Sequence, residues 1–304
     1  MEAIITIVGF LGAGKTTVLK YLLERYSNEG WRPFVILNDY ENATMDAQQL
    51  TNKIGLNSIK PLSGSCICCS GIVELRNTVN RIPERKDGIT FIEANGTSDA
   101  CSLMEFLGVG LHKRLLPPIQ ISVVDVKNWQ QRGEYNELEA NQIQVSSLLV
   151  LTHLENVHPN RKAQVIHELK KLNPVAKVLN MDRLDVLLLP ELVPSKNIAQ
   201  KFDHQKAHWA SCSVDLPDLV NTACIDAICA ALPKSILRVK GCTKIQGDIN
   251  FTYFERIPSG EVHIRPFNGT PITGAKLLSI GPGSTPALLK NAIKGALLHC
   301  SLNN

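Results

Sequence analysis

Short runs of apolar residues recur along the first part of the chain, with room for a helix between most of them. The six runs are AIITIV (3–8), FVIL (34–37), GITFI (88–92), IQISVVDV (119–126), SSLLVLT (146–152) and AKVLN (176–180). They are rich in β-branched residues and have few polar interruptions, which is typical of strands buried on both faces. The pattern predicts that these runs are strands of one buried sheet.

The segments between the runs repeat apolar residues at helical spacing. This spacing is clearest in Thr16–Tyr26, Gly71–Ile82 and Arg161–Leu172. Strands that alternate with helices predict an α/β fold in which a mostly parallel, doubly wound sheet has helices on both faces.

The pattern changes after about residue 190. The stretch LPELVPSKNIAQKFDHQKAH (189–208) is polar and contains prolines, as linkers often do. Beyond it, ILRVKGCTKI (236–245), INFTYFERI (249–257) and EVHIRPF (261–267) predict consecutive strands with a turn at 258–260, flanked by helices at 216–231 and 285–298. We therefore expect a nucleotide-binding domain over 1–190, a linker over 191–206 and a smaller α+β domain over 207–304.

Composition and charge limit the class of protein. The 304 residues are 44% hydrophobic and 20% charged, and the net charge is only +4, so nucleic acid is not expected as a partner. The N-terminus has neither a signal-peptide pattern nor a membrane span. We expect a cytoplasmic protein that has no membrane partner, keeps its thiols reduced, and forms a metal or redox site where cysteines cluster.

The stretch GFLGAGKTT (9–17) predicts a phosphate-binding loop. It follows a predicted strand, opens a predicted helix and fits the pattern G-x-x-x-x-G-K-[ST]. Glycines let backbone N–H groups surround a phosphate, lysine supplies a cation, and the hydroxyl that follows binds Mg²⁺. A flexible glycine turn with a chance lysine fits this context less well. The predicted cofactor-binding residues are Gly9, Gly12, Gly14, Lys15, Thr16 and Thr17, with Thr16 also a ligand of Mg²⁺.

Carboxylates follow two of the predicted strands, where ligands of parallel sheets bind. Asp39 and Asp46 lie in a long loop after the second run, and Glu93 with Gly96 ends the third. Such acids can hold Mg²⁺ or its water, and a glycine N–H can approach the γ-phosphate. The alternatives are ordinary loop carboxylates and a helix cap. Beside the phosphate loop, we take Lys15, Asp39 and Glu93 as candidate catalytic residues.

The stretch GSCICCS (64–70) places Cys66, Cys68 and Cys69 within four positions. Three thiolates suit Zn²⁺ and leave a fourth position open, and the helix predicted after them lowers thiol pKa values. The alternative is that some are small core residues. The other six cysteines lie among apolar residues and are expected to be structural: Cys101, Cys212, Cys224, Cys229, Cys242 and Cys300.

Together, GFLGAGKTT, LNDY, SGSCICC, IEANG, VVDV and the late LRVKG occur in an order that resembles the CobW-like GTPases, P-loop proteins related to the nickel-insertion GTPases of urease and hydrogenase maturation. The resemblance covers residues 1 to about 185 well and the C-terminal domain loosely. It implies a metallochaperone that binds GTP, Mg²⁺ and zinc or cobalt, and delivers the metal to a client metalloprotein. Asp39 and Asp46 would lie in the first switch, Glu93 and Gly96 in the second, and the three clustered cysteines would bind metal.

The chain departs from the family at the motif that reads the base. Where the family has Asn-Lys-x-Asp, this chain has Thr152–Glu155, THLE. Thr152 offers no amide and His153 no long stem, so Glu155 is left to accept hydrogen bonds from guanine. Two other functions stay open: a non-hydrolysing scaffold that senses nucleotide or metal, and an ATP-dependent P-loop enzyme whose cysteines are redox-active. The sequence permits an oligomer without indicating one.

Overall fold

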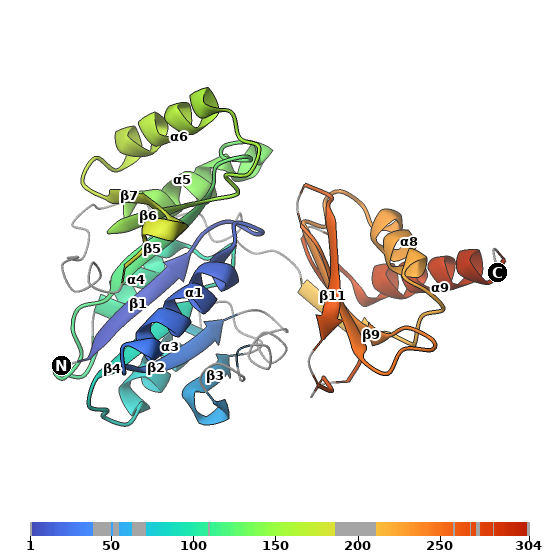
Figure 1. Cartoon of the computed structure of the whole chain (residues 1–304), viewed down its shortest axis with the longest axis horizontal. Helices are drawn as coiled ribbons and strands as arrows, with labels where there is room; N and C mark the ends of the chain where they lie inside the picture. Colours follow the sequence, from blue (N-terminus) through green and yellow to red (C-terminus); the bar gives the residue numbers. More distant parts are fainter. Residues whose placement is uncertain are drawn as a thin grey trace. The chain divides into compact units, whose positions relative to one another are not determined.

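The computed structural model describes residues 2–38, 50, 55–62, 71–108, 110–185, 211–257, 259–267, 269–271, 274–281 and 283–302. These residues belong to two compact units, one of which ends at residue 185 of the described chain while the other begins at residue 211. Figure 1 draws both. The predicted linker 191–206 lies outside the described residues, so the domain boundaries stay a prediction.

The first unit is built on a seven-stranded sheet of the order β3-β2-β4-β1-β5-β6-β7. All the strand pairs recorded in this sheet are parallel. The strands are β1 (Ala3–Val8), β2 (Arg32–Asn38), β3 (Ile59–Leu62), β4 (Gly88–Glu93), β5 (Ile119–Asp125), β6 (Leu148–Thr152) and β7 (Lys177–Asn180). The predicted parallel α/β fold is confirmed.

Helices cover both faces of this sheet, as predicted (Figure 1). The ring of Phe91 on β4 lies 5.5 Å from that of Tyr26 on α1 (Lys15–Asn28). The next residue, Ile92, belongs to the core with residues of α3 (Gly71–Arg81) and α4 (Ala100–Gly108). Successive side chains of a strand point to opposite faces, so α1 lies on one side of the sheet and α3 and α4 on the other.

Two further helices, α5 (Asn136–Gln144) and α6 (Pro159–Leu172), complete the described α-helices of this unit. Short 3₁₀ turns are η1 (Leu56–Ser58), η2 (Gly133–Tyr135) and η3 (Met181–Arg183). The sequence did not predict β3, α4 or α5. Strand β3 has four residues and contains a proline, and α5 buries polar side chains, so neither shows a clear apolar period.

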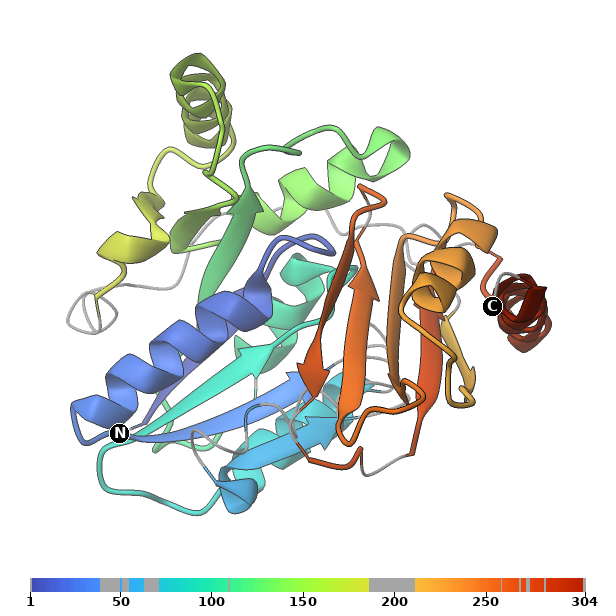
Figure 2. The ribbon, with the colours of Figure 1, turned by 45° about the vertical axis from the view of Figure 1, so that its right-hand side comes forward.

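The second unit contains a five-stranded antiparallel sheet of the order β11-β10-β9-β12-β8. Its strands are β8 (Ser211–Asp215), β9 (Arg238–Lys244), β10 (Phe251–Arg256), β11 (Val262–Phe267) and β12 (Lys276–Ile280). Helices α8 (Ala223–Ala231) and α9 (Pro286–Leu302) lie on one side of this sheet (Figure 2) and share its main core. This is the expected α+β architecture.

The helix predicted over 216–231 is wrong in its first half. Leu216 N–H donates to the carbonyl of Ala275, and Leu219 N–H donates to that of Lys244. These bonds hold the segment in an extended form beside the sheet, and α8 begins only at Ala223. Strands β8 and β12 were not predicted either.

The cysteines of the described residues differ in part from the expectation of reduced thiols. Cys224 on α8 and Cys300 on α9 form a disulfide, which corrects that expectation for this pair. Cys101, Cys212, Cys229 and Cys242 are buried, as expected of structural cysteines. Burial raises the pKa of Cys229 and of Cys242 to about 12.

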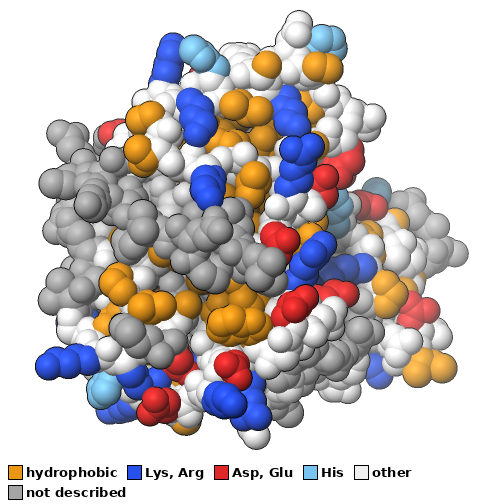
Figure 3. Space-filling model, turned by 60° about the vertical axis from the view of Figure 1, so that its left-hand side comes forward, with side chains coloured by type: hydrophobic (Ala, Val, Ile, Leu, Met, Phe, Trp, Pro, Cys, Tyr) orange, Lys and Arg blue, Asp and Glu red, His pale blue; other side chains and the backbone are white. Residues whose placement is uncertain are grey.

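The surface carries charges of both signs. Lys, Arg, Asp and Glu side chains lie among hydrophobic ones over the face drawn in Figure 3. Within the described part of the chain, none of the helices is long and apolar enough to cross a membrane.

Candidate functional site

The loop between β1 and α1 has the backbone that its glycines allow. Gly9, Gly12 and Gly14 all have positive φ angles, of 146°, 79° and 93°. A Cβ on Gly9 would lie 2.5 Å from the carbonyl oxygen of Val123, so only glycine lets the loop pass this close to β5. Gly14 precedes α1, which has neither a side-chain cap nor an acid in its first turn. The helix therefore presents a positive N-terminus that its own side chains do not neutralise.

Lys15 turns its ammonium into the curve of this loop. Its Nζ donates to the carbonyls of Gly9, at 2.9 Å, and Phe10, at 3.3 Å, and the residue is only 4% exposed. A buried cation at a helix N-terminus is what an anionic phosphate needs. The loop, the helix end and Lys15 fit a triphosphate.

Thr16 and Glu93 form the other polar pair at this end of the site. The Thr16 hydroxyl donates to Glu93 Oε1 at 2.7 Å. Glu93 comes within reach because β1 and β4 are neighbours, with Ile7 opposite Glu93. A hydroxyl and a carboxylate are hard oxygen donors of the kind that Mg²⁺ prefers. The residues present thus fit this ion beside the phosphate loop.

The loop after β4 packs directly against the phosphate loop. A Cβ on Gly96 would lie 2.7 Å from the backbone nitrogen of Leu11 and 2.5 Å from its Cδ2. The predicted second-switch glycine is therefore required for packing, whatever its N–H does with a nucleotide.

Buried polar side chains fix the shape of this loop. Asn95 Oδ1 accepts hydrogen bonds from Thr97 N–H, at 3.0 Å, and from the hydroxyls of Thr97 and Ser98, at 2.9 and 3.0 Å. From α5, Gln142 Nε2 donates to the carbonyls of Ser98, at 3.2 Å, and Gly96, at 3.4 Å. The loop is tied both to itself and to α5.

The segment after β6 that is predicted to read the base also contacts the phosphate loop. The Thr152 hydroxyl lies 2.7 Å from the Ala13 carbonyl and 3.0 Å from that of Val124. His153, at a φ of 50°, places Nε2 2.9 Å from the Gly12 carbonyl. A carbonyl only accepts, so this bond requires the tautomer with hydrogen on Nε2. Both side chains brace the phosphate loop.

Glu155 differs from these two residues because its side chain is exposed. Asn156, next to it, has a φ of 59°, so the chain turns sharply here. Of the residues predicted to read the base, Glu155 is therefore the most accessible to a ligand.

A buried ionic network lies beside the loop on the side of β5. Arg132 donates to Asp125 Oδ2 at 2.9 Å, and its Nε lies 3.6 Å from Glu139 Oε1. The Arg132 guanidinium also stacks 4.9 Å from the centre of the Phe10 ring. Burial raises the pKa of Glu139 to about 7 against the opposing effect of Arg132. Sequence reasoning missed this network, although Asp125 at a strand end was a visible signal.

The structure brings part of the predicted site together. Lys15, Thr16, Glu93 and Gly96 meet at one edge of the sheet, and Thr17 follows on α1 with an exposed side chain. Five predicted residues lie outside the described residues: Asp39, Asp46, Cys66, Cys68 and Cys69. Within the described residues, no three His, Cys, Asp or Glu side chains gather as a metal site.

The comparison with protein families identifies this arrangement. Residues 3–180, more than half of the chain, match the family model described as "CobW/HypB/UreG, nucleotide-binding domain". The chain belongs to this family. The matched span runs from β1 to the end of β7, so it contains the phosphate loop, Glu93 and the THLE segment of this CobW-type domain.

Individual relatives are similar over much of the chain. The chain is 26% identical to the zinc chaperone YjiA of Escherichia coli over 279 residues, which cover 84% of this chain and 86% of that protein. It is 25% identical to zinc-regulated GTPase metalloprotein activator 1 of Dictyostelium discoideum over 239 residues, 66% of this chain and 48% of the relative. The crystal structure of Zn(II)-bound YjiA GTPase from E. coli aligns with 97% of this chain and 98% of that one, at 19% identity and a TM-score of 0.45.

Proposed function

We propose that the chain is a GTP-dependent metal chaperone. It binds the triphosphate with Mg²⁺ in the phosphate loop, holds zinc or cobalt on Cys66, Cys68 and Cys69, and hydrolyses the nucleotide slowly to release the metal to a client metalloprotein. The observation that carries the proposal is the meeting of Lys15 with the 2.7 Å pair of Thr16 and Glu93. The names of two relatives, a zinc chaperone and a zinc-regulated GTPase metalloprotein activator, support the cargo and the nucleotide.

The residues of the phosphate end have distinct roles in this proposal. Lys15 would exchange its two carbonyl partners for phosphate oxygens, which carry full charge and bind a cation more strongly. Thr16 and Glu93 would hold Mg²⁺ and its water, and the ion, when bound, neutralises phosphate charge. Asp39 would act from the first switch as a further catalytic carboxylate, and Asp46 would contact the cofactor from the same segment.

Topology supports a link between the metal and the nucleotide. Strands β1, β2, β3 and β4 run parallel, so the segments that follow them all start at the same edge of the sheet. The phosphate loop follows β1, Asp39 follows β2, and the cysteine cluster follows β3. We therefore expect a change at the γ-phosphate to act on the thiols through segments that start at this edge.

Zinc titration tests the proposal. Zinc affinity of the reduced protein is measured by competition with a chromophoric chelator, with and without a non-hydrolysable GTP analogue, and Co²⁺ titration reads thiolate coordination directly. We expect the analogue to tighten metal binding by ~5–150-fold and the metal to tighten analogue binding by the same factor. Equal zinc affinity with and without the analogue would refute the chaperone mechanism.

Two variants separate the parts of this test. Joint replacement of Cys66, Cys68 and Cys69 by serine should remove metal binding and leave basal nucleotide binding unchanged. Lys15→Ala should retain metal binding but lose the effect of the nucleotide. Zinc binding that survives the triple replacement would assign the metal to other residues.

A further inference from the structure

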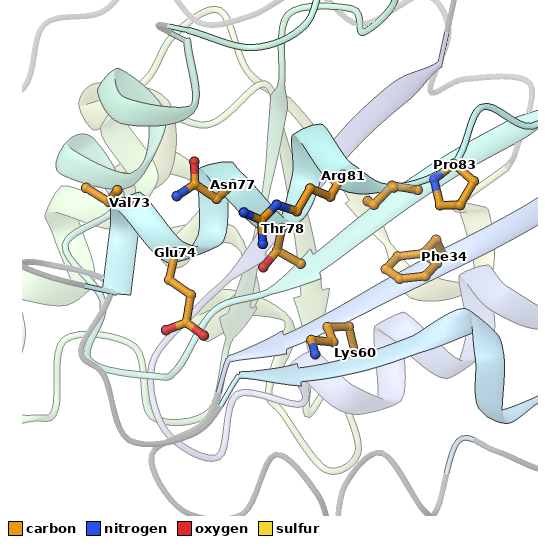
Figure 4. A pocket seen from close by; sticks show the side chains of 9 residues that line it. Phe34, Lys60, Val73, Glu74, Asn77, Thr78, Arg81 and Pro83 are labelled. Carbon is orange, nitrogen blue, oxygen red and sulfur yellow. The ribbon is translucent and has the colours of Figure 1, made fainter.

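A cavity of about 580 Å³ lies between α3 and the strands β2 and β3, lined wholly by described residues. Its volume is in the range of ligand-binding clefts. Figure 4 shows side chains of α3 along one wall and Phe34 of β2 with Lys60 of β3 on the other. None of the residues that line the cavity takes part in the interactions described for the nucleotide site.

Apolar side chains form part of the cavity. Phe34 is half-buried, and the Arg85 guanidinium lies 5.4 Å from the centre of its ring. Val73, on the first turn of α3, is 51% exposed, and Ile82 is buried after the end of the helix. An exposed valine facing a cleft that also contains an aromatic ring offers a place for an apolar side chain of a ligand.

The charged side chains of the cavity are mostly positive. Lys60 and Arg81 line it together with a single acid, Glu74, and all three are exposed. In the described part of the chain, neither Lys60 nor Arg81 has an ion-pair partner. The charge of the cavity therefore favours a ligand with carboxylates.

The cavity also lies close to the predicted metal site along the chain. Val73 is four residues after Cys69, and four residues span at most about 14 Å even when fully extended. Whatever the conformation between them, a ligand on the first turn of α3 is within that distance of the thiol-bearing segment. A protein that receives a metal from those thiols must bind at about this range.

We propose that this cavity is the docking site for an acidic peptide segment, with an apolar residue among its carboxylates, of the protein that receives the metal. This inference rests on the proposed function for the identity of the partner. The apolar residue packs against Phe34, and the carboxylates lie at Lys60 and Arg81. Val73 lines the other end of the cavity and provides a second apolar contact for the segment. Docking there holds the acceptor near Cys69 while the metal is transferred.

Peptide selection on the full-length chain tests the site. A random heptapeptide library displayed on phage is selected on the reduced protein, with and without zinc and the GTP analogue. We expect enriched peptides to combine Asp or Glu with Leu, Ile, Val or Phe. Enrichment of basic peptides, or no enrichment at all, would overturn the proposal.

Exposed substitutions then locate the binding of an enriched peptide. The double variant Lys60→Glu with Arg81→Glu should weaken it by about tenfold or more, and should gain affinity for the same peptide with lysine in place of its acids. Val73→Ser should also weaken it. Lys86→Glu, at an exposed lysine that does not line the cavity, is the matched control. Equal loss in the control, or no loss in the double variant, would refute docking at this cavity.

The same preparations separate this inference from the proposed function. Zinc and nucleotide affinities of the double variant should equal those of the wild type, because neither side chain belongs to the nucleotide site. Peptide binding without nucleotide-coupled zinc binding would preserve the docking site and refute the chaperone mechanism. Nucleotide-coupled zinc binding without peptide binding would preserve the chaperone mechanism and refute the docking site.

Discussion

The phosphate end and the base end of the nucleotide site follow strands of the same sheet, but their side chains serve different purposes. At the phosphate end, Lys15 is buried and Thr16 and Glu93 pair directly, so polar groups suited to phosphate and Mg²⁺ are already together. At the base end, Thr152 and His153 are turned back onto the phosphate loop, and only Glu155 is exposed.

This difference gives two residues of THLE a structural role. Two residues of THLE hold the carbonyls of Gly12 and Ala13, which fixes the loop that binds phosphate. Hydrogen bonds made to the loop are not available to a base. Affinity should therefore come from the phosphate end, and selectivity between bases should be small.

The largest expected effect is at the phosphate end, where Lys15→Ala should abolish most nucleotide binding. Truncating one partner of a buried, hydrogen-bonded charge pair costs ~2–5 kcal/mol, or ~30- to ~5,000-fold in affinity. Calorimetry with the GTP analogue measures the loss. Lys113→Ala, an exposed lysine of the same unit, controls for the change in net charge, and comparable affinity in Lys15→Ala and wild type would refute the phosphate-loop assignment.

The next largest effect concerns the ionic network that supports Phe10. The pKa of Glu139 is raised from 4.5 to about 7 by burial, so the folded state keeps this proton over a range in which the unfolded state loses it. The contribution of Glu139 to the free energy of unfolding is up to about 3 kcal/mol. It is fully present below about pH 4.5 and is lost as the pH rises through about 7. Glu139→Gln should remove this part of the pH dependence.

Urea unfolding at several values between about pH 4 and pH 8 measures the effect as the difference between variant and wild type. Glu137→Gln, an exposed residue of the same helix, is the matched control and should keep the wild-type slope. A pH dependence that is identical in Glu139→Gln and wild type would show that Glu139 does not titrate differently in the folded protein.

A smaller effect is expected when Thr152 or His153 loses its hydrogen bond to the phosphate loop, a pair of contacts that we call the brace. Thr152→Val keeps the shape and removes the hydroxyl, and His153→Ala removes the imidazole; each should weaken triphosphate binding by about fivefold, or ~1 kcal/mol. Thr152→Ser should restore binding. The decisive measurement is the ratio of the losses for GTP and ATP, because a brace predicts equal losses and a base reader predicts a loss for GTP alone.

The smallest effect is the preference between bases itself. A full polar readout can discriminate by ~10⁴ or more, whereas with Glu155 alone we expect GTP to be preferred over ATP by about fivefold or less. Thr152→Asn combined with Glu155→Asp should widen the margin, and competition binding of the two triphosphates measures it. A wild-type preference for ATP would contradict the assignment of GTP as the nucleotide.

Much of the first unit could be predicted because its strands are apolar on both faces and its phosphate loop has a strict pattern. The meeting of Thr16 with Glu93 depends on β1 and β4 being neighbours, and sequence alone does not give strand order. Helix α5 was missed because it buries Glu139 and Gln142 where an amphipathic pattern has apolar residues. The contacts of Thr152 and His153 with the phosphate loop were missed because THLE was considered only as a departure from a base-reading motif. Its sequence does not predict a hydrogen bond to the carbonyl of Gly12.

The contact between Gly96 and Leu11 limits the direction in which the loop after β4 can move. A Cβ on Gly96 would overlap Leu11, so at this residue the loop has little room to approach the phosphate loop when a nucleotide arrives. A loop that slides past Leu11 or withdraws from it must break the hydrogen bonds from Gln142 or carry them along. Helix α5 would then respond to the γ-phosphate through these bonds, and a change in its amide exchange would report the event.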